Sequence, residues 1–166
     1  MFPELPSEKL KALLKVYVRQ FFTLDGLWFL AVEDKFGLDA ATKLDEKVWD
    51  GLGFREAKRL KEALNLKGEN LQTLIETLKL TPFYFYGKSE FKETSDNKVV
   101  FRVVECPPQI ARVKAGRGEF PCKHVDLAYF KSFAQAINPK IKVKCLTAPP
   151  DPHPKEYWCE WEFNLE

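Results

Sequence analysis

The chain has 166 residues, of which 45% are hydrophobic, 30% charged and 14% aromatic. This length and balance suit one globular domain, and so many aromatic rings must either fill a core or line a cavity. The net charge of +2 is too small to indicate a nucleic-acid partner, because acidic residues are interleaved with the Lys and Arg residues and no basic stripe is present.

The N-terminal segment "MFPELPSEKLKALLKVY" lacks the apolar stretch and the small-residue cleavage site of a signal peptide. The longest apolar run, "LWFLAV", is too short to cross a bilayer. We therefore expect a cytoplasmic protein with no membrane partner. In that compartment cysteines serve as thiols, metal ligands or catalytic groups, and stable disulfides are rare.

Apolar residues at helical spacing predict that residues 1–80 are helical. Ser7 is a candidate cap for the first helix, and a turn at Asp25-Gly26 is expected to start a second, nearly all-apolar helix that ends at Gly37. Further helices are expected from residue 40 onward. Glycines at 51, 53 and 68 predict short loops between antiparallel neighbours.

At Pro82 the apolar period changes to two, which predicts strands. We expect "FYFYGKSEF" and "KVVFRVVEC" to form one hairpin, and "KIKVKCLT" and "YWCEWEFNLE" to form another. The segment "DLAYFKSFAQAI" between them predicts a helix, with Asp126 as a possible cap. The expected fold is thus one α+β domain over residues 1–166, with a helical part (1–80) packed on a four-stranded, mainly antiparallel ββαββ sheet part (81–166).

All four cysteines and both histidines lie in the last third of the chain, between Cys106 and Cys159. Together they could bind zinc or iron, because thiolates and imidazoles are the ligands of tetrahedral sites. No Cys-x-x-Cys pair is present, however, so buried cysteines that act as small hydrophobic residues and a thiol-lined ligand pocket remain alternatives. The candidate metal ligands are Cys106, Cys122, Cys145, Cys159, His124 and His153.

A last hairpin that folds symmetrically about Pro152 would place Cys145 directly opposite Cys159, with Cβ atoms about 5 Å apart. Trp161 shares the face of Cys159 and is a candidate ligand contact. Cys122 precedes a helix, whose dipole would stabilise a thiolate, and His124 is close enough in sequence to be its base. This pair forms the candidate catalytic site.

Three further residues are candidates for ligand binding. Arg112 and Arg117 flank "VKAG", and an arginine beside glycines can hold a carboxylate with two hydrogen bonds. Glu33 lies in an apolar helix, where it faces either a pocket or the exposed edge. A ferritin-like di-iron site would need histidines in the first half, which has none.

The segments "LDGLWFLAVEDKFG", "ECPPQIARVKAGRGEFPCK", "IKVKCLTAPPDPHP" and "WCEWEF" resemble a family of prokaryotic cytosolic proteins of unassigned function. That family is distantly similar to L-2-amino-thiazoline-4-carboxylic acid hydrolases, which open a sulfur-containing ring. It is also similar to vinyl-reductase-type domains, which bind small hydrophobic ligands on an α+β scaffold. The resemblance implies a small-molecule pocket and assigns no catalytic residue.

We therefore expect a small-molecule-binding protein with a cysteine-lined pocket, which would be a hydrolase of a small sulfur- or carboxylate-containing compound if Cys122 is a nucleophile. One alternative is a zinc or iron sensor that uses the same thiols. Another is a scaffold protein without catalysis. A homodimer is compatible with each of these functions.

Overall fold

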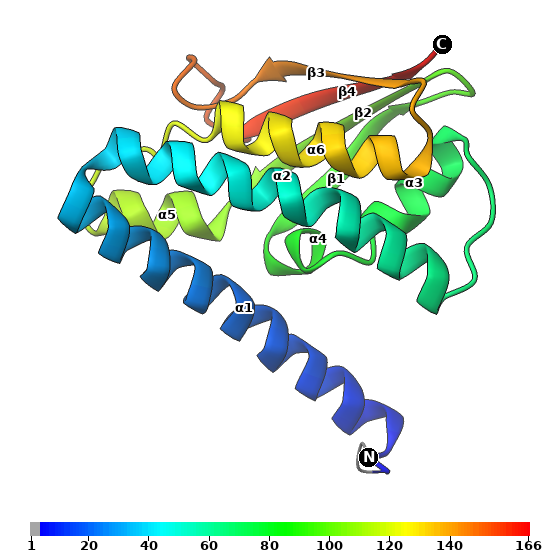
Figure 1. Cartoon of the computed structure of the whole chain (residues 1–166), viewed down its shortest axis with the longest axis horizontal. Coiled ribbons are helices and arrows are strands. Elements are labelled where there is room, and N and C mark those ends of the chain that lie inside the picture. The colour runs from blue at the N-terminus through cyan, green and yellow to red at the C-terminus, as the bar shows by residue number, and fades with distance from the viewer. Residues whose placement is uncertain (1–3) are drawn as a thin grey trace.

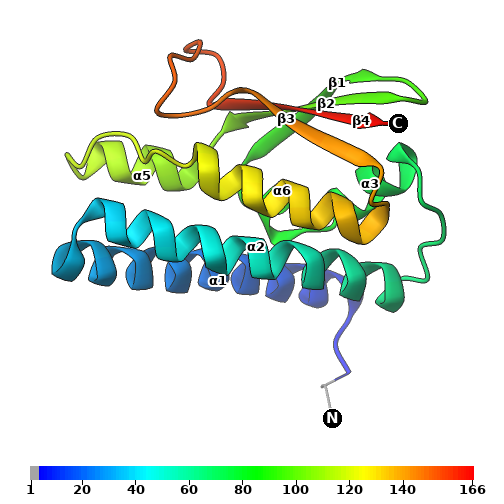
Figure 2. The same cartoon turned by 45° about the horizontal axis from the view of Figure 1, so that its top comes forward.

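The computed structural model describes residues 4–166, which form three layers (Figure 1 and Figure 2). The first layer is a four-stranded antiparallel sheet in the order β1-β2-β4-β3. Helix α6 lies beneath the sheet, and α2 lies beneath α6 with α1 beside it. The strands are β1 (Lys88–Thr94), β2 (Lys98–Glu105), β3 (Ile141–Thr147) and β4 (Cys159–Leu165). The helices are α1 (Ser7–Phe36), α2 (Leu38–Ala63), α3 (Leu71–Leu78), α4 (Pro82–Tyr86), α5 (Pro107–Lys114) and α6 (Lys123–Ile137).

This arrangement confirms the predicted α+β class, with a mostly helical N-terminal half and the sheet in the C-terminal half. Two helices, α5 and α6, separate the two strand pairs, where the ββαββ prediction has one. In the part of the chain that the structure describes, no helix has the length and apolar character needed to cross a membrane.

Aromatic rings fill the core between α6 and the sheet. Phe130 of α6 is fully buried, and its ring centroid lies 5.1 Å from that of Trp161 and 5.8 Å from that of Phe101. Trp161, a predicted ligand contact, is thus a fully buried core residue between β4 and α6. Burial of rings of this size contributes most of the free energy that holds α6 to the sheet.

The predicted turn at Asp25-Gly26 is wrong, because α1 runs without a break from Ser7 to Phe36. A single glycine costs a helix only about 1 kcal/mol, which the packing of α1 on its neighbours offsets. The side of α1 that carries Phe22 packs on Trp49 of α2 and on Tyr86, whose ring stacks on that of Phe22 at 4.2 Å. Asp25 therefore lies within the packed part of a helix instead of in a loop.

The predicted loop at Gly51–Gly53 is also wrong, because α2 is continuous from Leu38 to Ala63. Gly53 allows α2 and α6 to approach closely. A Cβ atom at this position would meet the Ser132 hydroxyl and would lie 2.5 Å from the backbone carbonyl oxygen of Tyr129. This glycine is required for helix packing and not for a turn.

The predicted strand "FYFYGKSEF" forms a strand only from Lys88 onward, and its first half is the short helix α4. The Thr81 hydroxyl accepts a hydrogen bond from the Tyr84 amide at 3.2 Å, and Pro82 occupies the first helical position. Both features favour the start of a helix. The alternating rings favour a strand in the sequence pattern, but in α4 Phe83, Tyr84 and Tyr86 are partly buried while Phe85 is exposed.

The predicted pairing of Cys145 with Cys159 is wrong. In the β3–β4 ladder Cys145 lies opposite Trp161, and Cys159 lies opposite Val103 of β2. The whole ladder, from Ile141 opposite Leu165 to Cys145 opposite Trp161, is offset by two residues from a hairpin symmetric about Pro152. The cysteine couple proposed from the sequence does not form.

The close approach of α2 and α6 gives a direct test. Gly53→Ala should lower the free energy of unfolding by about 1–3 kcal/mol, because the backbone carbonyl of Tyr129 cannot move away from the new methyl group. Gly51→Ala is the matched control, since its nearest neighbour is the mobile tip of Arg55 at 3.2 Å. That variant should gain up to about 1 kcal/mol from helix propensity. Urea denaturation measures both, and equal effects would contradict the packing role of Gly53.

Candidate ligand cavity

A cavity of about 260 Å³ lies among α1, α2, α4, α5 and α6. Its wall is mostly apolar, as is usual for small-molecule sites. The volume is just below the range of about 300–1,000 Å³ for drug-sized ligands, which indicates a smaller molecule. The rings that line the cavity are Phe22, Phe29, Trp49, Phe83, Tyr86 and Phe120.

Three carboxyl groups interrupt this apolar wall: Asp25 from α1, Asp45 from α2 and Asp126 from α6. Burial raises the pKa of Asp25 to about 6 and that of Asp126 to about 7. Burial, together with repulsion from Asp25 and Asp126, raises the pKa of Asp45 to about 8. These groups therefore exchange protons near neutral pH, where an exposed Asp is fully ionised.

The two arginines at the cavity are already paired with acids. Arg112 is 8% exposed and donates from both terminal nitrogens to Glu33, at 2.6 and 2.7 Å. Arg117 contacts Asp34 at 2.8 Å. The pairing with Arg112 lowers the pKa of Glu33, which keeps this carboxylate charged. A ligand carboxylate would have to compete with Glu33 and Asp34 for the predicted arginine anchors.

Cys106 and Cys122 line the same cavity, whereas Cys145 and Cys159, which were expected to line the pocket as well, do not. Burial raises the pKa of Cys106 to about 12, and burial followed by the nearby Asp126 raises that of Cys122 well above its ordinary value. Cys122 occupies the position before α6, but burial and the Asp126 carboxyl outweigh the helix dipole expected to favour its thiolate. Both groups are therefore neutral thiols at neutral pH.

Gln109 fixes the loop that carries Cys122. Its side chain donates to the Phe120 carbonyl and accepts from the Phe120 amide, both at 2.8 Å, and it also donates to the Cys122 sulfur at 3.4 Å. The loop turns at Gly116 and Gly118, whose φ angles of 74° and 73° other residues rarely adopt. This predicted Arg-Gly turn therefore shapes the cavity wall, and Gln109 holds it in place.

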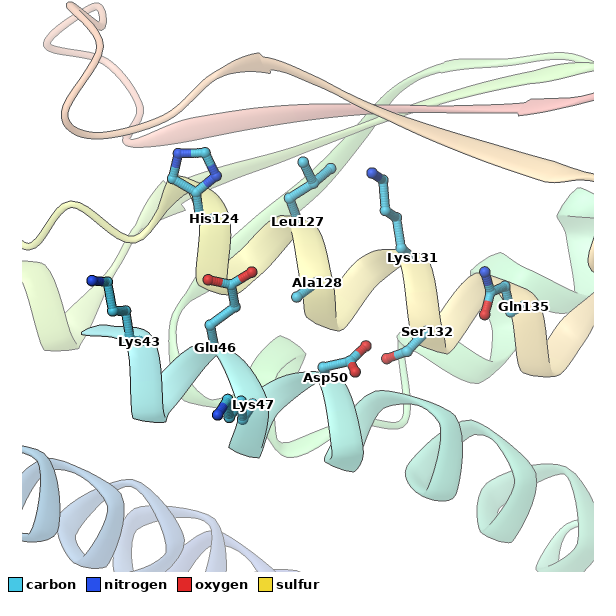
Figure 3. Close-up of a pocket in the computed structure, with 10 residues that line it drawn as sticks. All are labelled: Lys43, Glu46, Lys47, Asp50, His124, Leu127, Ala128, Lys131, Ser132 and Gln135. Carbon is cyan, nitrogen blue, oxygen red and sulfur yellow. The ribbon is translucent and has the colours of Figure 1, made fainter. Parts of the chain in front are cut away.

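His124 points to a different place from Cys122. It lines an outer groove of about 680 Å³ between α2 and α6, together with Lys43, Glu46 and Lys131 (Figure 3). Cys122 lines the inner cavity, on the other side of α6. The predicted nucleophile and base are thus assigned to two separate hollows, and their catalytic pairing stays a prediction.

The remaining candidate metal ligands lie on other elements, although Cys159 is near enough to Cys122 to add to the rise of its pKa, and Cys106 and Cys145 add to that of Cys159. Cys159 is buried in the core on β4, and Cys145 is half-buried on β3. His153 lies on the loop before β4, where its Nε2 is 3.4 Å from Glu119. Within residues 4–166 no group of three or more His, Cys, Asp or Glu side chains is arranged to hold a metal ion. The zinc or iron site stays a prediction.

Comparison with known proteins gives a family. The sequence pattern of one family matches residues 3–165, nearly the whole chain. The chain belongs to DUF6125, a family of unknown function. This agrees with the predicted resemblance to a family of unassigned function, whereas the prokaryotic origin stays a prediction. No functionally curated protein matches the sequence.

Among solved structures, the fold of this DUF6125 chain is similar to subunit 3 of a trafficking protein particle complex from Naegleria fowleri, solved covalently bound to palmitic acid. The TM-score is 0.51 and the sequence identity 12%, over 96% of this chain and 97% of that one. At this identity the likeness concerns the fold alone. The structural match is to a trafficking-complex subunit and not to an amino-thiazoline hydrolase.

The carboxyl cluster is the feature that the sequence analysis missed, although a signal was present. Asp25 follows Phe22 by three residues, Asp45 precedes Trp49 by four, and Asp126 follows Cys122 by four. These spacings put each acid on the same helix face as a buried residue. Acids on the buried faces of three helices would have indicated a shared polar site.

The raised pKa of Asp45 has a consequence for stability. A carboxyl with a higher pKa in the folded state contributes stability below its ordinary pKa of 3.8, and loses it as pH rises towards about 8. Asp45→Asn removes this loss. We expect the free energy of unfolding of the variant to exceed that of the wild type by roughly 2 kcal/mol at about pH 8 and by less at about pH 5. This figure allows for screening by water at a half-buried group.

Urea denaturation at both pH values measures this difference. Asp50→Asn, an exposed position on the same helix, is the control and should not change the pH dependence. An Asp45→Asn gain that is equal at both pH values would contradict the buried-carboxyl explanation.

Proposed function

We propose that this protein binds a small, mainly apolar molecule in the cavity among α1, α2, α5 and α6. The observation that carries the proposal is an aromatic-lined cavity of about 260 Å³ with a few polar groups at defined places. Such a combination is typical of ligand sites, since rings supply affinity and polar groups orient the ligand. The similarly folded Naegleria subunit, which holds palmitic acid, supports the same class of function.

Binding has more support than hydrolysis. A nucleophilic cysteine needs a thiolate and a base within hydrogen-bond reach, at about 2.6–3.2 Å. The pKa of the Cys122 thiol is raised, and its predicted base His124 lines the outer groove. The cavity as it stands can enclose a molecule, and Cys122 would need a change of surroundings to attack one.

Gly26 allows the cavity to be filled without damage to the fold. It lines the cavity, and a Cβ atom there would have no other atom within 4 Å. Gly26→Leu should therefore project a side chain into the cavity and abolish saturable binding of 1-octanol, measured by calorimetry. Helix propensity favours the change by about 1 kcal/mol, so the melting temperature should not fall.

The control is Gly51→Ala on α2, which does not line this cavity. It should bind octanol as the wild type does. Equal octanol affinity in Gly26→Leu and the wild type would overturn the proposed function, and so would a wild type that binds neither octanol nor its amine and carboxylate analogues of the same length.

We also propose that the partner is a second copy of the chain, bound through the outer face of α1 and α2. Along α1, apolar residues recur at alternating intervals of four and three, the spacing at which two helices interlock. Apart from the half-buried Phe21, they are between 43% and 71% exposed. The seam consists of Leu10, Leu14, Tyr17, Phe21, Leu24 and Trp28.

Several features of this face support a dimer. Leu44, Val48 and Phe54 of α2 are also about half exposed, so the apolar area extends beyond one helix. Exposed apolar side chains gathered on one face are typical of protein interfaces. The opposite face of the molecule, on the sheet, instead carries ion pairs such as Arg102–Glu160 at 2.6 Å. A seam of this spacing is complementary to its own copy about a two-fold axis.

Light scattering tests the dimer. Leu14→Glu with Leu24→Glu should convert a dimer into a folded monomer, since each change places a charge in the seam. Leu146→Glu on β3, where the native side chain is 40% exposed, is the control and should leave the dimer intact. A monomeric wild type at tens of micromolar, about the range of a weak dimer, would contradict the proposal. So would a dimer that survives the double change, and binding of the seam to lipid vesicles instead would name a different partner.

A further inference from the structure

The cavity holds three carboxyl groups and no free cation to balance them. Asp25, Asp45 and Asp126 form no ion pair with the Lys, Arg or His residues of the described chain, positions 4–166. The two cavity arginines, Arg112 and Arg117, are paired with Glu33 and Asp34. Buried carboxylates without a counter-charge are costly, so a ligand that supplies one gains binding energy.

The arrangement selects the kind of cation. The carboxyls come from three different helices, and with the neighbouring side chains they form no group arranged to hold a metal ion. Rings line the same space. Burial raises the pKa of Asp25 and of Asp45, and the Trp49 indole lies close enough to both carboxyls to lower it by a smaller amount. Carboxylates on separate helices around a ring-lined space suit an organic ammonium ion, which is larger than a metal ion.

The rings offer a second attraction to the same charge. Phe22 stacks on Tyr86 at 4.2 Å and lies 6.1 Å from Trp49, and Phe29 meets Phe120 at 4.7 Å. The faces and edges of these rings make up much of the wall. An ammonium group beside such rings is attracted to their electron-rich faces, most strongly when it is shielded from water.

We propose that the ligand is an organic cation, a primary or quaternary ammonium compound. Its apolar part would pack against the aromatic wall of the cavity, and its charge would lie among Asp25, Asp45 and Asp126. This inference rests on the proposed function and names the chemical class of its ligand. An anionic molecule such as a free fatty acid would face repulsion from the same three groups.

Binding is coupled to pH. The groups at the cavity that bear on its charge are Asp25 of α1, Asp45 of α2, Asp126 of α6, Tyr86 of α4, Arg112 of α5, Cys106, Arg117 and Cys122. Burial raises the pKa of Asp25 to about 6, that of Asp45 to about 8 and that of Asp126 to about 7. The cation favours their ionised form, so its affinity rises as pH rises through this window, and protons are released on binding.

Three probes of matched length test the proposal: octylamine, which is a cation below about pH 10, 1-octanol, which is neutral, and octanoate, which is an anion. Calorimetry at about pH 8 should show octylamine binding roughly ten-fold more tightly than octanol, with octanoate weakest. At about pH 5 the advantage of octylamine should largely disappear, because the carboxyls are protonated. The double variant Asp45→Asn with Asp126→Asn should likewise lose most of the preference for octylamine over octanol at about pH 8.

The outcomes separate the two proposals. If octanol binds and octylamine binds no better at any pH, the cation inference fails and the proposed function stands. If octanoate binds most tightly, the cation inference fails in the same way. If none of the probes binds, the proposed function fails. Asp50→Asn, an exposed position on α2, should retain the full preference for octylamine, and loss of the preference there would assign it to surface charge instead of the cavity.

Discussion

Helix α6 is confined between two layers, and this constraint determines the rest of the structure. Its fully buried Phe130 packs on Trp161 and Phe163 of the sheet, while its other side meets α2 at Gly53 without room for a methyl group. A helix packed on two sides keeps only a narrow strip facing solvent, here His124, Lys131 and Gln135, so its orientation about its own axis is fixed. The first turn of α6 must then place Asp126 inward. Cys122, the residue that precedes α6, lines the same cavity wall. The polar site is thus a consequence of the packing of apolar residues elsewhere on α6.

Helix α1 shows what happens where such a constraint is absent. Its C-terminal half is held through Phe22, the Arg112–Glu33 pair and the rings of Phe29 and Phe120, whereas its N-terminal half projects away from the body (Figure 1). Because α1 closes only one side of the cavity and leans outward, space remains between it and α5. The same helix therefore has two apolar sides, one that encloses the cavity and one that is exposed along the seam. The exposed apolar side chains thus gather on the α1 and α2 layer, and the opposite face of the sheet carries charge pairs.

The sequence was sufficient for the class of the fold and the order of most elements, because these follow from local periodicity. It was not sufficient wherever tertiary contacts give a residue a different structural role from the one that its local sequence predicts. Gly53 predicts a loop by itself and a close helix contact beside Ser132, and Pro82 with its rings predicts a strand until Thr81 caps a helix. The cysteines behave likewise: their number and position indicated a pocket, and two of them, Cys106 and Cys122, do line it, but the ladder register moves Cys145 away from Cys159. The three aspartates were visible one by one, and only the meeting of α1, α2 and α6 makes them a site.

The thiols and carboxyls of the cavity belong to one electrostatic system. Burial is the main reason that the pKa of Cys122 is raised, and the adjacent Asp126 is the next. The same carboxyl adds to the rise for Cys106 and for Cys159. An ionised Asp126 therefore keeps these thiols protonated, and a positive charge beside Asp126 would offset that influence. The cavity therefore carries negative charge on its carboxyls before its sulfurs, and its two cysteines stay protonated near neutral pH.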